Sequence, residues 1–371
     1  MKSSQIENIS LWQLFILIII FEIGSSVVVG VGSEAKQDAW LAVLIGGMIG
    51  LFVVLLYLVM LKKSSNKTLF GIIESCFGKW FSKPIILLYV LYFFYISSRV
   101  LRDFSELMVS SIFVHTPLEV ISITMILVII YTLYFGIEVL SRTSEIFFPY
   151  VISFTLILGL GILMSGEMKF TNLQPFLAEG VGPIAKSIFP TILTFPFGEM
   201  IAFTMIIPAV KNHKLARRVV PFAVIVSAVI LSYSTFIQTA TLGVQMRARS
   251  NFPLLSAARE ISLLNFIERV DLLVVFVVMF GIIVKVGIFF YGGLKGLEHI
   301  FQKPYRSFAL PVGLLIALFS VMVSGNFAEH IEEGIRFVPY YIHMPMQFYL
   351  PVLLFVFTLF KFRKKRKVKN E

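Results

Sequence analysis

Long apolar runs constrain this chain more than any other feature, because ten of them are long enough to cross a lipid bilayer as helices of about 20 residues. Hydrophobic residues make up 58% of the 371 residues and charged residues only 14%, whereas a soluble domain carries about 25% charged residues. The sequence therefore predicts an all-α polytopic membrane protein with ten transmembrane helices. The expected spans cover residues 11–31, 40–61, 84–112, 118–137, 146–165, 187–208, 219–243, 272–294, 307–324 and 346–361.

The lysines and arginines of the loops predict how these spans are oriented. An even number of spans places both termini on one side of the membrane, and most basic loop residues lie on that side, many of them in the tail 362–371. Positive charge favours the cytoplasmic side, so both termini are expected to be cytoplasmic. Topology and attraction to anionic lipid account for the basic tail, and no nucleic-acid partner is expected despite the net charge of +11.

Enzyme chemistry finds little support in the sequence. The chain contains no H-E-x-x-H, G-x-S-x-G or P-loop motif. Its single cysteine, Cys76, excludes an internal disulfide. The five histidines are expected in loops or near span ends, without metal-ligand spacing; they are His115, His213, His299, His330 and His343. We expect no catalytic residue, cofactor or metal site.

The first span, "LFILIIIFEIGSSVVVGVG" at residues 14–32, carries a carboxylate and weak helix formers near its middle. Glu22 is followed by Gly24, Ser25 and Ser26. Glycine disfavours a helix interior by about 1 kcal/mol, and a charge inside a membrane is costly enough to be functional by default. The pattern predicts that this helix is interrupted near the bilayer midplane.

The sixth span shows the same kind of interruption at a similar depth. In "FPFGEM", Pro196, Gly198 and Glu199 fall near the middle of residues 187–208, and proline removes a backbone donor and clashes with the preceding turn. Glycine and proline are common in membrane helices, so a purely structural break is the alternative for either span.

The position of the two interruptions indicates an internal repeat. Span one runs outward from the cytoplasm and span six runs inward, which makes them the first helices of two five-helix halves with opposite orientation. Transporters of the LeuT type have this arrangement, with discontinuous helices at a midplane site. We expect one membrane domain, with repeat one at about 11–165 and repeat two at about 187–361.

Opened helices explain why a ligand is expected at this depth. Their freed backbone groups are tolerated only beside a cavity or a bound molecule, and an amino acid offers a carboxylate for a helix N-terminus and an ammonium for carbonyls. Glu22 and Glu199 could supply charge to the ammonium, relay a proton, or hold the break together.

Further charges lie in spans three and eight. Arg99 and Asp103, and also Arg102 and Glu106, are spaced i,i+4, so this stripe can neutralise itself on one helix face. The cluster is expected in the outer half of the span, where snorkelling to the interface is the simplest interpretation. Lys285 has no charged neighbour in its own span and must pair with another helix, face water or stay neutral.

Two loops and one glycine pair complete the pattern. Residues 64–83 mix aromatics with lysines, as an interfacial helix does. Residues 251–270 are amphipathic and are expected either on the headgroups or as a lid over an outer vestibule. Gly46 and Gly50 form a G-x-x-x-G pair, which indicates close packing within or between chains.

Seven stretches resemble the spore germination protein family, specifically the B subunits of germinant receptors within the amino acid–polyamine–organocation superfamily. They are "ISLWQLFIL" at 9–17, "EIGSSVVVG" at 22–30, "QDAW" at 37–40, "NLQPFLAEG" at 172–180, "FPFGEM" at 195–200, "FPLLSAAREI" at 252–261 and "ERVD" at 268–271. The resemblance implies a LeuT-like fold in the inner membrane of the spore, A and C subunits as partners, and a small germinant as ligand.

The resemblance also implies a pocket among helices one, three, six and eight. With the residues singled out above, the expected ligand site comprises Glu22, Gly24, Ser25, Ser26, Tyr95, Ser98, Phe195, Phe197, Gly198 and Glu199. Lys285, Glu22 and Glu199 are the candidates for ion or proton coupling.

Three functions remain open from the sequence. The resemblance favours a nutrient-sensing receptor subunit that binds an amino acid and signals to its partners. A proton-coupled amino acid permease needs the same pocket and the same two conformations, and a pore component for ions is the third possibility.

Overall fold

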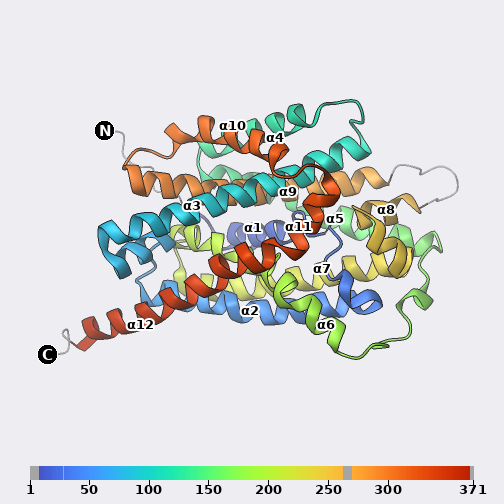
Figure 1. Ribbon diagram of the computed structural model, residues 1–371, viewed down its shortest axis with the longest axis horizontal. Helices are drawn as coiled ribbons and strands as arrows, with labels where there is room; N and C mark the ends of the chain where they lie inside the picture. The colour runs from blue at the N-terminus through green and yellow to red at the C-terminus, as the bar shows by residue number, and fades with distance from the viewer. Residues whose placement is uncertain (1–7, 28, 262–269, 368–371) are drawn as a thin grey trace.

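The computed structural model describes residues 8–27, 29–261 and 270–367 of an all-helical protein (Figure 1). Within this described part, an isolated bridge between Ile9 and Val210 is the one β interaction. The α-helices are α1 Leu11–Ile23, α2 Ala39–Lys63, α3 Leu69–Ser111, α4 Leu118–Tyr134, α5 Ile137–Met164, α6 Gly182–Ser187, α7 His213–Arg249, α8 Pro253–Arg259, α9 Asp271–Phe301, α10 Arg306–Met322, α11 Phe327–Arg336 and α12 Leu350–Lys367. The tighter 3₁₀ segments are η1 Ser33–Asp38, η2 Phe170–Leu173, η4 Phe197–Met205 and η5 Ile207–Ala209, and the wider π segments are η3 Ile188–Ile192 and η6 Pro339–Tyr349.

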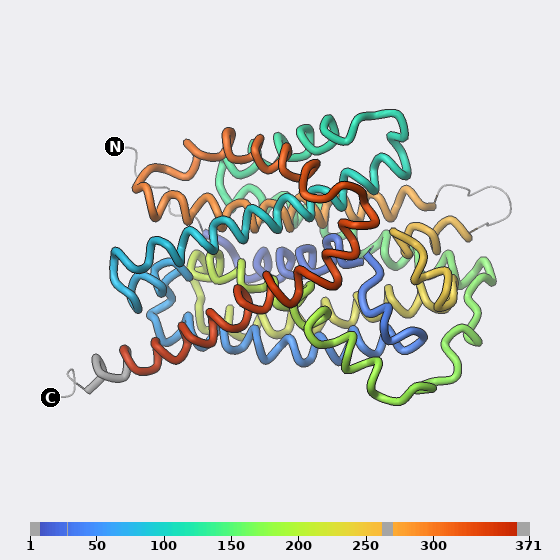
Figure 2. Tube along the Cα trace, in the orientation of Figure 1, coloured from blue at the N-terminus to red at the C-terminus, as the bar shows by residue number. Residues whose placement is uncertain are grey.

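Helix α1 forms the centre of the bundle, as Figures 1 and 2 show. Leu14 and every residue from Ile16 to Ile23 are buried, as expected for a helix that is apolar all round. α1 packs against α5, α7 and α9, while α3 runs along α9, α2 along α7, and α4 along α10. The interrupted helix is therefore enclosed by other helices of the bundle.

Seven helical segments of the described chain are long and apolar enough to cross a membrane. α10 and α11 count as an eighth if this pair, bent by 100°, forms one broken span. α1 and α4 are apolar but shorter, with 10–17 residues. All ten predicted segments contain helix, and an integral membrane protein follows from their length and composition.

Two predicted boundaries differ from the observed ones. The interfacial helix expected at 64–83 and the third span are both part of α3, and the backbone turns at Gly78, where φ is 81°, rather than at Pro84. Glycine adopts this left-handed conformation without steric cost. In the loop 251–270, α8 accounts for Pro253–Arg259, whereas the predicted helix positions 262–269 lie outside the described residues.

The glycine pair in α2 packs within the chain. A Cβ at Gly46 would meet the side chain of Ile192, and one at Gly50 would lie 2.6 Å from Cβ of Phe197. Gly47, between them, faces the Phe197 ring, and a Cβ at Gly47 would lie 2.9 Å from the tip of that ring. The α2 glycine groove, Gly46–Gly50, therefore receives the second interrupted segment, and the prediction of close packing is confirmed inside one chain.

Candidate functional site

The first interruption follows directly from the sequence "EIGSS". α1 ends at Ile23, and Gly24 takes φ 20° and ψ −124°, which diverts the chain while its N–H still bonds the carbonyl of Ile20 at 2.9 Å. Ser25 and Ser26 then lie in turns rather than in helix. α9 crosses closely here, because a Cβ at Gly281 would lie 2.6 Å from Cα of Gly24. Glycine on both sides of the crossing makes this approach possible.

The second interruption spans several changes of helix type. The π segment η3 is followed by a short α turn, then by Phe195 and Pro196 outside any helix, then by the 3₁₀ segment η4. Proline has no N–H to donate, and the 3₁₀ geometry after it is typical of a helix under local constraint. Both predicted interruptions are therefore present.

A buried ion pair joins the two interruptions. Lys285 Nζ on α9 lies 2.6 Å from Glu199 Oε2 on η4, with both side chains at most 2% exposed. The same ammonium donates to Ser26 Oγ at 3.4 Å and lies 4.5 Å from the ring centre of Phe195. Of the three alternatives expected for Lys285, the structure shows the first, a partner on another helix. A fully desolvated pair needs such additional contacts to be stable.

Glu22 lies close to this pair without a hydrogen bond of its own. It is fully buried, and within the described residues neither carboxylate oxygen has a hydrogen-bond partner. Lys285 and Glu199 both act on it electrostatically. Three titratable groups from three elements thus share one apolar environment beside the interruptions.

A cavity of about 100 Å³ opens next to Glu199. Its lining comes from the segment 29–34 after the first interruption, from Phe195 and Glu199, from α3, from α11 and from His343 of η6. A single buried water needs about 10–15 Å³ of such space, so the cavity has room for more than water and can hold a small molecule.

The predicted site residues divide into two groups. Phe195 and Glu199 line the cavity, and Ser26 reaches Lys285 as described. Gly24 and Ser25 form the first turn itself, and Glu22 precedes it.

The remaining predicted residues contact other parts of the bundle. Phe197 fills the α2 glycine groove, and Gly198 lies against the side chain of Gln347. Ser98 bonds the carbonyl of Phe94 within α3, while the hydroxyl of Tyr95 lies 3.4 Å from Arg99.

A buried polar network on η6 was missed by the sequence interpretation. Tyr92 OH lies 2.9 Å from His343 Nδ1 and accepts from Gln347 Nε2 at 2.7 Å, while Tyr89 donates to the carbonyl of Met346 at 2.9 Å. The network lies on the π segment that contains Pro345, and Tyr89 supplies a hydrogen-bond donor to one of its carbonyls. The signal is present in the sequence, because "HMPMQ" combines proline with polar residues as the sixth span does, but hydropathy alone places His343 at a span end.

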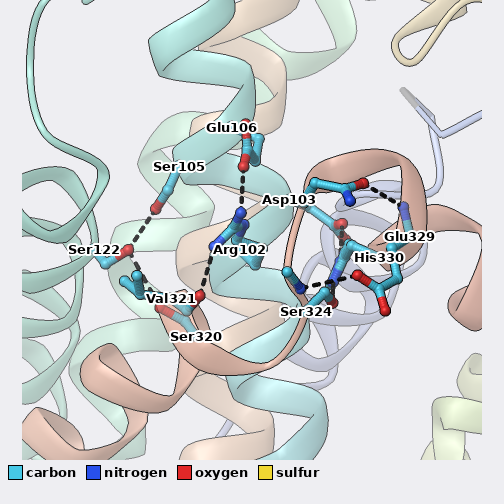
Figure 3. Close-up of polar contacts among 12 residues, drawn as sticks. Arg102, Asp103, Ser105, Glu106, Ser122, Ser320, Val321, Ser324, Glu329 and His330 are labelled. Carbon is cyan, nitrogen blue, oxygen red and sulfur yellow. Dashed lines mark hydrogen bonds and ion pairs between the residues drawn. The ribbon is translucent and has the colours of Figure 1, made fainter.

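The charged stripe of α3 pairs differently from the prediction. Arg102 does bind Glu106 at 2.6 Å, and it also donates to the carbonyl of Val321 at 2.8 Å (Figure 3). Asp103, however, pairs with His330 of α11 at 2.9 Å, as Figure 3 shows.

The predicted ion pair between Arg99 and Asp103 is therefore wrong. Arg99 contacts Glu333 of α11 instead. Helix spacing allows the pairing within α3, but α11 folds across this face and offers closer partners. Arg99 and Arg102 are also buried rather than snorkelling to an interface.

Two of the motifs that carry the family resemblance pack against each other. Gln37 donates to the carbonyl of Pro175 at 2.9 Å, and Asp38 accepts from the backbone N–H of Leu177 at 3.1 Å. These two hydrogen bonds hold the loop "NLQPFLAEG" against the motif "QDAW".

The fold and the site define a helical integral membrane protein in which two interrupted helices meet at a buried ion pair beside a small cavity. In the described part of the chain, no three histidine, cysteine or acidic side chains are grouped as metal ligands.

The model of the family described as "Spore germination protein" matches residues 8–328, and the chain belongs to this family. It is 36% identical to spore germination protein KB of Bacillus subtilis over 365 residues, which is 98% of each chain. It is 26% identical to spore germination protein A2 of the same organism, over 88% of this chain and 87% of that one. Spore germination protein GerQB of Bacillus cereus is 22% identical over 93% and 96% of the two chains. The resemblance to the spore germination protein family drawn from the seven motifs is confirmed.

Proposed function

We propose that this chain is the nutrient-sensing B-type subunit of a spore germinant receptor, and that it binds a small germinant, an amino acid, in the cavity beside the two interruptions. The observation that carries this proposal is a cavity beside Glu199 of the second interruption, together with the buried Lys285 that joins Glu199 to Ser26 of the first interruption. Membership of the germination family supports signalling rather than metabolism as the outcome of binding.

The proposed architecture is a ten-helix, LeuT-like bundle with two inverted halves. Matching interruptions in the first and sixth apolar segments support it. On this topology both termini face the cytoplasm and the protein resides in the inner membrane of the spore. Germinant receptor A and C subunits are the proposed partners that read its conformation.

Ligand binding acts in this proposal by population shift. A germinant that binds one conformation more tightly stabilises it by its differential affinity. The cavity is lined by the segment 29–34 and α3 of the first proposed half and by Phe195 and Glu199 of the second, so a bound molecule touches both proposed halves and can favour one relative arrangement.

The test is ligand-dependent thermal stabilisation of the purified full chain, screened over amino acids, sugars and nucleosides. An excess of ligand at about 100 times its Kd adds about 2.7 kcal/mol of apparent stability, which a thermal scan resolves. Stabilisation by an amino acid, lost in Gly24→Leu, is the expected result. If no nutrient stabilises the wild-type chain, the receptor assignment is rejected.

A proton-coupled amino acid permease is the second candidate, and Glu22 favours it. A buried carboxyl group without a hydrogen-bond partner in the described structure is well placed to take up and release a proton. Proteoliposomes separate the two functions. Accumulation of a labelled amino acid driven by a proton gradient, and lost in Glu22→Gln, supports the permease, whereas binding without accumulation supports the sensor.

A further inference from the structure

Arg99 presents a buried positive charge to the cavity wall. The residue lines the cavity, and its side chain is only 8% exposed. One guanidinium nitrogen donates to the carbonyl of His330, and the other lies 3.3 Å from Glu333 and 3.4 Å from Tyr95 OH. Glu333 is 39% exposed, so the one anion paired with this buried cation in the described chain is partly in water and at a long distance.

The other charges that face the cavity have partners of their own or lie in water. Glu199 is paired with Lys285 at 2.6 Å, and Asp103 with His330 at 2.9 Å. Glu34 is exposed. A buried cation without a close buried anion is expensive, and Arg99 is therefore the group at the cavity whose charge is least compensated.

The wall around Arg99 is shaped for its guanidinium. A Cβ at Gly334 of α11 would lie 2.9 Å from Nη2 of Arg99, so glycine at this position leaves room for the guanidinium group. Ile96, Val100 and Ile335 line the same cavity with apolar side chains.

We infer that the ligand carries a carboxylate and that Arg99 binds it, displacing the long contact to Glu333. This inference rests on the proposed function and names its ligand class as a small carboxylate with an apolar side chain. The planar guanidinium fork matches a carboxylate with two parallel hydrogen bonds. Arg99 also donates to the carbonyl of His330. The bound carboxylate is therefore linked to α11 through Arg99.

The experiment measures thermal stabilisation of the full chain in lipid nanodiscs by L-alanine, L-valine and L-leucine, by their primary amides, and by D-glucose. The amides keep size and ammonium but lose the carboxylate. We expect at least one acid to stabilise the wild type, and its amide to bind about tenfold to a hundredfold more weakly, as for a lost charge-assisted hydrogen-bonded pair.

Variants separate recognition from folding. Arg99→Met is expected to lose the acid-dependent shift, whereas Arg102→Met, on the same helix but paired with Glu106 away from the cavity lining, keeps it. Glu333→Gln removes the competing anion and is expected to bind the acid severalfold more tightly. A merely structural Arg99 would predict no gain in Glu333→Gln, which keeps the test valid even if Arg99→Met fails to fold.

The outcomes distinguish this inference from the proposed function. Stabilisation by D-glucose or by the amides as strong as by the acids, an unchanged response in Arg99→Met, or unchanged or weaker acid binding in Glu333→Gln overturns the role of Arg99 while leaving a receptor. If none of these probes and no other nutrient stabilises the wild type, the receptor assignment itself falls.

Discussion

Replacing Lys285 by methionine is the sharpest test of how the two interruptions are held together. The substitution keeps most of the side-chain volume but leaves Glu199, 2% exposed, without the ammonium at 2.6 Å. Removing one partner of a buried ion pair costs about 3–5 kcal/mol. Glu22 lies in the same environment, so two buried carboxyl groups then lose their shared cation. We expect Lys285→Met to lie at the upper end of that range.

Replacing the other partner of the ion pair, Glu199, by glutamine is expected to destabilise the chain less. In Glu199→Gln the ammonium keeps the neighbouring Glu22 carboxyl group and gains an amide oxygen as acceptor. The double variant Lys285→Met/Glu199→Gln leaves no unpaired charge from this pair, and the uncompensated buried charge is what makes removal of a single partner costly. The double variant is therefore expected to be more stable than Lys285→Met alone, with a coupling energy of at least about 2 kcal/mol.

The assay is reversible unfolding in mixed detergent micelles, followed by tryptophan fluorescence. Lys295→Met on the same helix is the matched control, because Lys295 pairs with Glu298 in a partly exposed position, with side chains 29% and 32% exposed. An exposed pair contributes at most about 1 kcal/mol. Unfolding of Lys285→Met within about 1 kcal/mol of the wild type, or strictly additive effects in the double variant, would refute the buried-pair reasoning.

Three further perturbations test the neighbouring contacts. Gly281→Ala places a Cβ 2.6 Å from the backbone of Gly24 and is expected to destabilise the chain by about 1–3 kcal/mol through overpacking, measured by the same unfolding assay; an unchanged midpoint would contradict the close crossing. Gly198→Leu crowds Gln347 and the backbone near the second interruption, and we expect it to abolish the nutrient response in spores while the protein still accumulates; normal germination would reject this position. Asp38→Ala removes the acceptor for the N–H of Leu177, and limited proteolysis within residues 166–181 is expected to become faster, whereas an unchanged cleavage rate would show that the loop is held by other contacts.

The interruptions could be predicted from the sequence because their causes are local. Glycine, serine and proline weaken a helix wherever they occur, and a carboxylate such as Glu22 or Glu199 stands out in an apolar run. The sequence also marked Lys285 as a charge that needs a partner, water or neutralisation, and pairing with another helix is the alternative that the structure shows. The apolar runs also predicted where the long helices lie, because hydropathy is a local property of the sequence.

The partners in space were harder to predict, because they lie far apart in the chain. Asp103 and His330 are 227 residues apart, and Tyr92 and His343 are 251 apart. Hydropathy places α11 near a surface, but does not reveal its bend of 100° relative to α10. That bend brings α11 across α3, which is why Arg99 pairs with Glu333 and not within its own helix.

The α2 glycine groove has a consequence for how this protein can move. Phe197 of the second interrupted segment sits against the backbone of α2, with no side-chain layer between them to slide over. A shift of that segment toward or away from a bound molecule must therefore carry α2 with it, and α2 in turn packs along α7. In the proposed receptor, the moving part would thus be a multi-helix block, large enough for a neighbouring subunit to sense.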